Sequence, residues 1–349
     1  MIKKQENFHL ENDAVCEAGL KSSPWQQTDD TLTRVNGQNH HCHVVCNPVY
    51  TSYHTRARKE RLSVLDVLNN GGKRLFRLNE EAIGYLESIP WSKKARKTIQ
   101  GWQSEQDWEE AAFVERLEEG LPKLSQQQRK LLLDAAAVAA YHAQKDYPVV
   151  KALVCDDAPQ FNWLGQEMML CWVHDGRHYK KLMPVIALHR KLLDDFLKQF
   201  WEYYHQLLDY CKQPSVEEHL RLETQFDVLC SNYTGYDALD QRIAKTKAKK
   251  ESLLLVLQYP ELPLHNNASE LGVRQRVRKR DASFGPRNED GVKSWDTFET
   301  LAETAKKLKV SFYKYLVDRI TCTNQIQPLA NLVSSRANDL NLGWSFPVP

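Results

Sequence analysis

The pair Asn36-Gly37 constrains the fold of this chain more than any other short feature. It lies between two segments with strand-like composition, WQQTDDTLTRV (25–35) and QNHHCHVVCN (38–47). Asn-Gly between such segments is a strong hairpin signal, because both turn residues take positive φ. A third strand-like segment, PVYTSYHT, follows directly. We therefore predict three antiparallel strands, preceded by an unpatterned stretch, residues 1–24, that we expect to be a loose leader.

The pattern of apolar residues then changes along the chain. Two short, nearly continuous apolar runs, VVKALVCDD and EMMLCWV, lie between segments with helical spacing, which is typical of buried parallel strands. The other segments are helical over 57–145, 174–257, 267–281 and 293–320, and irregular from 321 onward.

Three strands, a helical block, two strands and further helices are the order of an RNase H-like (retroviral-integrase-like) fold. We therefore predict an α/β protein with a mixed five-stranded sheet and large helical insertions. The predicted parts are a leader (1–24), a core (25–180) with a helical insertion (57–145), a second insertion (181–260), core helices (261–320) and an irregular tail (321–349).

Composition indicates a soluble globular protein and argues against a membrane partner. Of the 349 residues, 42% are apolar and 26% charged, and no apolar run approaches the roughly 20 residues that span a bilayer. The first residues lack the apolar stretch of a secretory signal, so we expect a cytoplasmic protein. The eight cysteines include no CxxC pair, which favours reduced thiols over a disulfide framework.

The net charge of +2 does not by itself indicate a nucleic-acid partner, but local basic clusters do. Five basic residues occupy the seven positions 274–280. We expect four of them to contact phosphates: Arg274, Arg278, Lys279 and Arg280. The alternative for this cluster is a solvated helix face.

Two pairs of acids, Asp29-Asp30 and Asp156-Asp157, fall where strands are expected. In an RNase H-like sheet the first and fourth strands are parallel neighbours, so one Asp from each would lie about 5 Å from the other. Carboxylates this close repel unless a cation lies between them, and Mg²⁺ or Mn²⁺ prefers oxygen ligands. Taken separately, an exposed strand edge and a strand-end turn would explain the two pairs.

Glu270 is the best candidate for a third acid, and it has two interpretations. It can complete a helix cap with Asn267 as the N-cap residue, or it can turn inward beside Val273 and Val277 and bind metal. With a third carboxylate the site would hold two ions, as in phosphodiester cleavage.

Two other segments resemble metal sites. In HHCHVVC (40–46) the histidines and cysteines of a strand point to opposite faces, which excludes a closed zinc site. Cys171 and His174 have CxxH spacing without a second pair, which favours a role in packing or in support of neighbouring ligands over direct metal binding.

Taken together, these motifs resemble the DDE superfamily of transposases, and most closely the bacterial insertion-sequence transposases of the IS sixty-six type. Four stretches carry the resemblance: TDDT (28–31), LVCDDAPQFNWL (153–164), MLCWVHDGRHY (169–179) and HNNASELGVRQRVRKRDASFG (265–285). The likeness extends over roughly residues 25–320.

The resemblance implies that Asp29, Asp156 and Glu270 are the catalytic, metal-binding triad, with the first member of each Asp pair favoured. It implies two Mg²⁺ or Mn²⁺ ions, cleavage of transposon ends, strand transfer to target DNA, and a homo-oligomer in the active complex. We assign Asn267, Cys171 and His174 to support of the metal ligands.

The sequence also departs from that family. His265 stands where the family has Asp, and Leu271 where it has Arg. The family's N-terminal zinc-binding and helix-turn-helix parts have no counterpart, so we expect a truncated copy or one half of a split enzyme. Two alternatives stay open: an inactive DNA- or partner-binding remnant, and an RNase H-like nuclease or resolvase.

Overall fold

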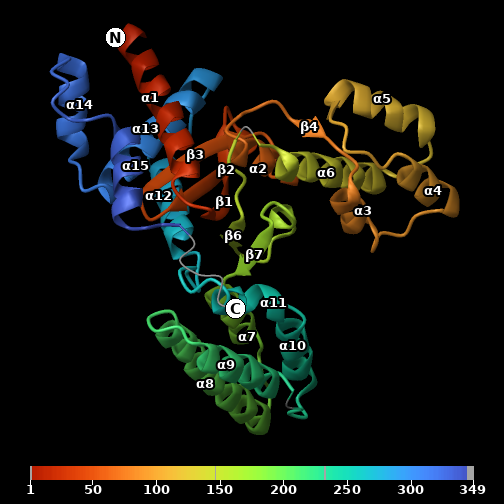
Figure 1. Cartoon of the computed structure of the whole chain (residues 1–349). Helices are drawn as coiled ribbons and strands as arrows, with labels where there is room; N and C mark the ends of the chain where they lie inside the picture. Colours follow the sequence, from red (N-terminus) through yellow and green to blue (C-terminus); the bar gives the residue numbers. More distant parts are fainter. Residues whose placement is uncertain (1, 146, 232, 344–349) are drawn as a thin grey trace.

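A mixed sheet of five strands forms the centre of the computed structural model, which describes residues 2–145, 147–231 and 233–343 (Figure 1). The strand order is β3-β2-β1-β6-β7. The strands are β1 (Trp25–Val35), β2 (Gln38–Asn47), β3 (Tyr50–Arg56), β6 (Ala152–Cys155) and β7 (Glu167–Leu170). The predicted mixed five-stranded sheet is thereby confirmed.

The first three strands form the predicted antiparallel meander. Asn36 and Gly37 both have positive φ, 48° and 77°, as the hairpin turn requires. β6 and β7 are the two short apolar runs, and β6 pairs in parallel with β1 on one side and with β7 on the other. All four residues of β6 are buried, which explains its apolar composition.

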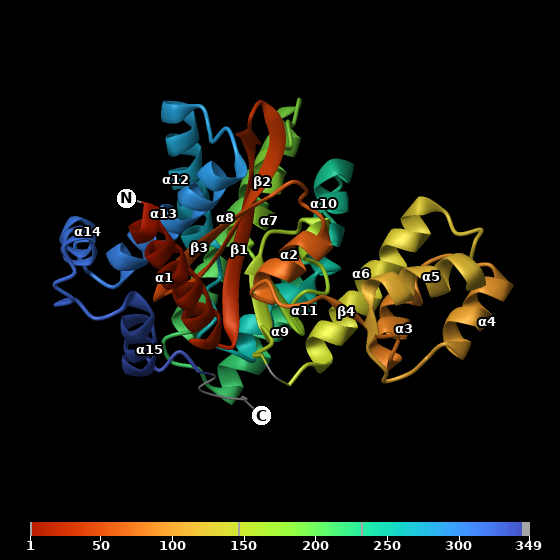
Figure 2. The same ribbon diagram turned by 90° about the horizontal axis from the view of Figure 1, so that it is seen from above.

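The first insertion lies between β3 and β6 and projects to one side of the sheet (Figures 1 and 2). Its elements are α2 (Arg61–Leu68), β4 (Leu75–Phe76), α3 (Glu80–Leu86), α4 (Lys93–Gly101), β5 (Trp108–Glu109), α5 (Glu110–Gly120) and α6 (Gln126–Ala143). The expected helices are present. The small β4–β5 sheet was not expected, because two-residue strands leave no pattern in the sequence.

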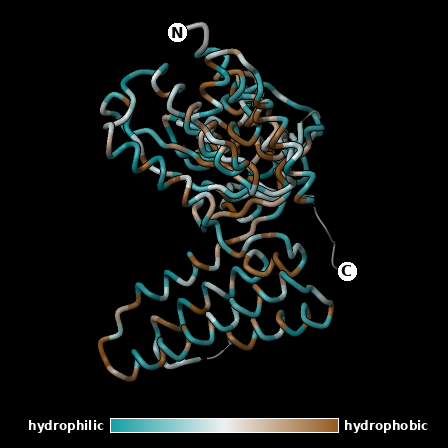
Figure 3. Tube along the Cα trace, turned by 90° about the vertical axis from the view of Figure 1, so that its left-hand side faces the viewer, coloured by the Kyte–Doolittle hydropathy of each residue, from teal (hydrophilic) through white to brown (hydrophobic). Residues whose placement is uncertain are grey.

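The second insertion forms a helical lobe on the other side of β7 (Figures 1 and 3). Helix α7 (Trp172–Lys180) leads into it from β7. Its own elements are α8 (Ala187–Tyr210), α9 (Val216–Leu229), α10 (Asp237–Lys247), α11 (Lys250–Leu253) and the short 3₁₀ helix η2 (Leu255–Leu257). Trp172, Phe200 and Phe226 pack against one another in its core. The aromatic residues of α8 thus serve packing.

Two helices, α12 (Asn267–Ser283) and α13 (Glu289–Lys307), cover one face of the sheet. The single helix expected over 293–320 is wrong, since α13 ends and α14 (Phe312–Thr321) begins as a separate helix. Lys309 adopts positive φ (59°), and the Ser311 hydroxyl accepts a hydrogen bond from the Lys314 backbone N–H. These two residues end one helix and cap the next.

Both ends of the chain are more ordered than expected. Within the stretch predicted to be a loose leader, helix α1 (Ile2–Lys21) packs against α13 and α15. Within the tail predicted to be irregular, helix α15 (Leu329–Asp339) buries Leu329, Val333 and Ala337. These three residues follow a spacing of four, which aligns them on one helix face. Residues 344–349 lie outside the described residues.

A close contact between α12 and the sheet fixes the position of that helix. The fully buried residues of α12 are Ser269, Gly272 and Arg276. Of the two valines that the sequence suggested, Val273 is partly buried and packs against Cys42, Val44 and Tyr53 of the sheet. A Cβ at Gly272 would lie 2.8 Å from Val44 Cγ1, and the Tyr53 hydroxyl donates to the Gly272 carbonyl at 3.1 Å. Glycine is therefore required for the helix to approach this closely.

Arg276 is fully buried one turn further along α12. It forms ion pairs with Asp296 and Glu299 of α13, which join the two helices over the sheet. Within the described ranges, no helix is both long and apolar enough to cross a membrane.

We predict that Gly272→Ala lowers the free energy of unfolding by about 1–2 kcal/mol, because the new methyl group must displace Val44 or the helix. Gly84→Ala is the matched control, since a Cβ on this α3 glycine meets nothing within 4 Å. The free energy of unfolding of that control should rise by about 0.5–1 kcal/mol, because alanine has a higher helix propensity than glycine. Urea denaturation measures both, and equal gains for the two variants would contradict the close contact.

Candidate active site

Asp29 and Asp156 lie at matching positions on neighbouring parallel strands. Gln27 of β1 pairs with Val154 of β6, and each acid comes two residues after its member of this pair. Two residues carry a strand through one full pleat, so both acids point to the same face of the sheet. Asp156 stands just past the end of β6, where its Oδ1 accepts the Ala158 backbone N–H at 3.1 Å.

The same face is the one that α12 covers. Asp29 is opposite Val44 in the β1–β2 ladder, and Val44 is the residue against which Gly272 packs. Glu270 precedes Gly272 by two residues in the first turn of α12, and its side chain is 19% exposed. The three acids predicted from the sequence are thus brought to one face.

The electrostatics of Asp29 reflect this arrangement. Burial, together with the charges of Asp156, Asp30 and Glu270, raises its pKa to about 7, against the hydrogen bond from the Asp30 backbone N–H. Burial also raises the pKa of Asp156, whereas the Ala158 N–H and nearby His174 lower it. The carboxylates therefore repel one another in the absence of a cation.

The second members of the two Asp pairs have other partners. Asp30 points to the opposite face and accepts a hydrogen bond from Gln160 Nε2 at 2.6 Å. Asp157 forms an ion pair with Lys249, which lies just before α11. The geometry thus agrees with the preference for Asp29 and Asp156.

The predicted helix cap at Glu270 is wrong. The N-cap residue of α12 is Asn266, one position earlier than expected, and its side chain makes no capping hydrogen bond. Asn267 is exposed, and Glu270 does not fold back on it. Instead, Arg177 of α7 donates to both Glu270 oxygens, at 3.1 and 3.4 Å. The helix starts early because the Asn266 carbonyl already accepts the Glu270 N–H at 3.1 Å.

Cys171 and His174 stand beside Glu270 at the start of α7. Cys171 is the buried N-cap residue of that helix, and His174 Nδ1 lies 3.6 Å from Glu270 Oε1. Burial raises the pKa of the Cys171 thiol, while the nearby backbone N–H groups of Asn266, His174 and Val173 act in the opposite direction. Both residues thus lie next to Glu270, and their supporting role stays a prediction.

Sequence reasoning missed Asn266 and Arg177. Asn266 is fully buried, and neither atom of its side-chain amide has a hydrogen-bond partner among the described residues. The sequence has two adjacent asparagines, Asn266 and Asn267, and either can cap a helix, so the sequence alone did not assign a role to Asn266. Arg177 follows His174 by three positions on α7, and this spacing puts both side chains on one helix face. The spacing could therefore have indicated that Arg177 lies near the site.

The basic residues of α12 divide into two groups. Arg274 and Arg278 are exposed and follow Glu270 at intervals of one turn. Lys279 lies 4.5 Å from the centre of the Trp295 ring, and burial lowers its pKa. Arg280 donates to the Leu32 carbonyl of β1. Arg274 and Arg278 are therefore the residues best placed to meet a partner.

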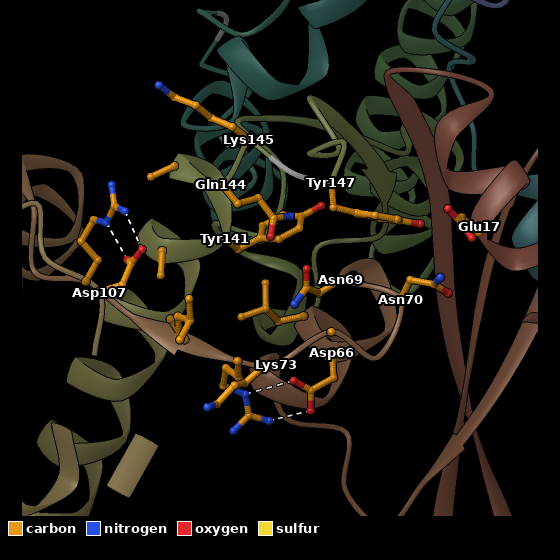
Figure 4. Close-up of a pocket in the computed structure, with 18 residues that line it drawn as sticks. Glu17, Asp66, Asn69, Asn70, Lys73, Asp107, Tyr141, Gln144, Lys145 and Tyr147 are labelled. Carbon is orange, nitrogen blue, oxygen red and sulfur yellow. Dashed lines mark hydrogen bonds and ion pairs between the residues drawn. The ribbon is translucent and has the colours of Figure 1, made fainter. Parts of the chain in front are cut away.

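The most spacious pocket described lies elsewhere (Figure 4). It has a volume of about 820 Å³ and is lined mainly by α2, β4 and α6. Asp66 on its wall pairs with Arg74 at 2.6 Å, and Tyr141 and Tyr147 face the same space. None of the three acids lines it. The pocket belongs to the junction between the first insertion and the core.

We predict that Asp29→Asn stabilises the metal-free protein at pH 8 but not at pH 4. A carboxyl group whose pKa is raised from 3.8 to about 7 binds its proton more tightly when folded, so its stabilising contribution is lost as pH rises through 7. The gain at pH 8 should be on the order of 1–3 kcal/mol.

Thermal denaturation in a chelator at both pH values measures this gain. Asp30→Asn is the matched control, because it removes the neighbouring charge on the opposite face and leaves a side-chain oxygen that can accept the hydrogen bond from Gln160 Nε2. A variant Asp29→Asn that is less stable than the parent at pH 8 would show that the acids do not repel one another.

Comparison with known proteins identifies the family of the chain. The family model described as Transposase IS66 family matches residues 135–294, a span that includes Asp156, Cys171, His174 and Glu270. An uncharacterized protein of Sinorhizobium fredii (strain NBRC 101917 / NGR234), y4jO, is 32% identical over 324 residues, which cover 92% of this chain and 99% of that protein. No solved structure matches the chain. The chain belongs to the IS66 family of transposases.

Proposed function

We propose that the protein is a DNA transposase of the DDE type, which cleaves DNA at transposon ends and transfers the freed strand to target DNA. Asp29, Asp156 and Glu270 form its metal-binding triad. The observation that carries the proposal is the meeting of these three acids on one face of the sheet, where the charges of two of them raise the pKa of the third. The strand order, with β1 between antiparallel β2 and parallel β6, supports an RNase H-like core.

The three side chains fit Mg²⁺ or Mn²⁺. All three offer carboxylate oxygens, the ligands that these ions prefer, and a bound cation would remove the repulsion that raises the pKa of Asp29. Two such ions supply activation of an attacking oxygen and stabilisation of a leaving oxygen in phosphodiester chemistry. The role of the protein is to hold the carboxylates at fixed positions, two on adjacent strands and one on a helix locked by Gly272.

The surface beside the acids suits a polyanion. Arg274 and Arg278 extend from Glu270 along the exposed side of α12, so a phosphate backbone lying on this helix would pass directly into the acids. Basic side chains hold and orient the strand, whereas the triad acts on one phosphodiester bond. We propose transposon terminal inverted repeats and target DNA as the partners, and a homo-oligomer as the active complex.

An inactive remnant is the competing function. The intact set of three acids and the close fit of α12 to the sheet favour an active enzyme, because nothing in packing alone requires three carboxylates to converge. A general RNase H-like nuclease would not need the CxxH motif at the start of α7. In this protein, His174 of that motif lies beside Glu270, the third acid.

We predict that Asp156→Asn lowers Mg²⁺-dependent nicking of supercoiled DNA carrying the matching terminal repeats on the order of 100-fold or more. The variant should retain its fold and its DNA affinity, because Asp156 makes only one local hydrogen bond, to Ala158. Asp157→Asn is the matched control and should cleave normally. Equal cleavage by the parent and Asp156→Asn would refute the proposed triad. Calorimetric titration with Mn²⁺ provides a second measurement, since Glu270→Gln should weaken binding.

We predict that Arg274→Ala combined with Arg278→Ala weakens DNA binding about equally for all sequences. Loss of two phosphate contacts should reduce the slope of log affinity against log salt concentration by about 2. Fluorescence anisotropy at several salt concentrations measures this slope. Lys314→Ala on α14 removes an exposed charge far along the chain and should leave the slope unchanged. An unchanged slope in the double variant would exclude α12 as the DNA-binding surface.

A further inference from the structure

The start of α7 and the start of α12 bring together three different metal-ligating groups. Cys171, His174 and Glu270 each offer one possible metal-ligand atom, and these three atoms lie within 4.8 Å of one another. Among the described residues, no other group of three or more His, Cys, Asp or Glu residues is arranged in this way. Cys171 and His174 come from the first turn of α7, and Glu270 comes from the first turn of α12. Two helix N-termini thus converge on one small volume.

We propose that Cys171, His174 and Glu270 form a binding site for a divalent transition-metal ion of the Zn²⁺ class, with a fourth position left for water. This site goes beyond the proposed transposase function and shares one residue, Glu270, with it.

Several polar atoms at this place lack the partners that a purely structural role would give them. His174 Nδ1 is buried without a hydrogen bond, because 3.6 Å to Glu270 Oε1 is too long for one. The Asn266 side-chain amide is fully buried, with neither polar atom paired within the described part of the chain, and the Asn266 backbone N–H lies near enough to the Cys171 thiol to lower its pKa. Unpaired buried polar groups cost about 1–3 kcal/mol each, so the cluster is incomplete as it stands.

The chemistry of the three ligands selects the ion. A thiolate, an imidazole and a carboxylate are the ligand types of Zn²⁺, and sites with three protein ligands keep a fourth position open. Mg²⁺ binds oxygen and takes neither sulfur nor imidazole readily. This site therefore prefers a softer ion than the site formed by the acids alone.

Arg177 occupies the place of a cation at this cluster. Its Nη1 lies 3.0 Å from His174 Nε2 and its Nη2 3.1 Å from Glu270 Oε2, while its side chain is 47% exposed. A donor on Nε2 keeps the proton of a neutral imidazole on Nδ1, the nitrogen that faces Glu270 Oε1. Metal binding at Nδ1 thus requires Arg177 to leave Nε2, and its exposure makes this movement feasible. The arginine and the ion compete.

Titration of the full-length, metal-free protein with Co²⁺ tests the proposal, because a thiolate bound to Co²⁺ gives a charge-transfer band in the near ultraviolet. We expect one equivalent of Co²⁺ to produce this band and Zn²⁺ to abolish it. Cys171→Ser should remove the band, and Cys322→Ser, which changes an exposed cysteine, should retain it. His174→Gln should weaken Co²⁺ binding, and Arg177→Gln should strengthen it on the order of 10-fold.

The outcomes separate this site from the triad. Asp156→Asn should retain the Co²⁺ band while losing nicking. In the parent protein, a band without nicking would refute only the transposase proposal. Nicking without a band in the parent protein would refute only the metal site. A band that persists in Cys171→Ser would also overturn the proposal, provided that circular dichroism shows this variant to be folded. Should Cys171→Ser unfold, the band in His174→Gln decides, because unchanged Co²⁺ affinity there excludes the cluster.

Discussion

The parallel pairing of β1 with β6 is the interaction on which the site depends. Its register, Gln27 opposite Val154, sets Asp29 and Asp156 at equal height on the same face. A slip of one residue would turn one of the acids to the other face, since the side-chain period of a strand is two. The buried apolar residues of β6 oppose such a slip, because it would also pack them against different neighbours.

Parallel strands need a long connection, and here the whole first insertion provides it. The second insertion separates α7 from α12 in sequence, yet their starts are joined. The Trp172 N–H donates to the Leu264 carbonyl at 3.0 Å, and the Trp172 indole N–H donates to the Leu253 carbonyl at 2.8 Å. These two hydrogen bonds close the helical lobe and return the chain to the sheet, which is why Cys171 and Glu270 become neighbours.

Local signals in the sequence predicted much of the sheet. Asn36-Gly37 predicted the hairpin, and the alternation along β2 predicted His41 and His43 on the face opposite Cys42 and Cys46, which agrees with the continuous pairing of that strand. The position of Asp29 beside Asp156 on a neighbouring parallel strand was predicted from the strand order alone. What could not be predicted depends on contacts distant in sequence. Helix α1 is weakly patterned and gains its order from α13 and α15, and the side chain that holds Glu270 comes from another helix.

Glu270 lies between two sets of proposed ligands with different preferences. On one side are the oxygens of Asp29 and Asp156, and on the other are the sulfur of Cys171 and the imidazole of His174. Without a metal ion, the protein reduces the charge of this crowded region in two ways. Burial and neighbouring carboxylates raise the pKa of Asp29 to about 7, so it remains partly protonated near neutral pH. Arg177 meanwhile pairs with Glu270.

A cation can replace either of them. A hard ion would displace the proton from Asp29, and a softer ion would displace Arg177 from His174. The carboxylate of Glu270 has two oxygens, and Oε1 lies 3.6 Å from His174 Nδ1. An ion held there by sulfur and nitrogen would fix the orientation of the carboxylate and with it the oxygen left for the triad. Occupancy of the softer site would therefore change the geometry of the harder one. This coupling follows from the shared residue and requires no movement of the sheet.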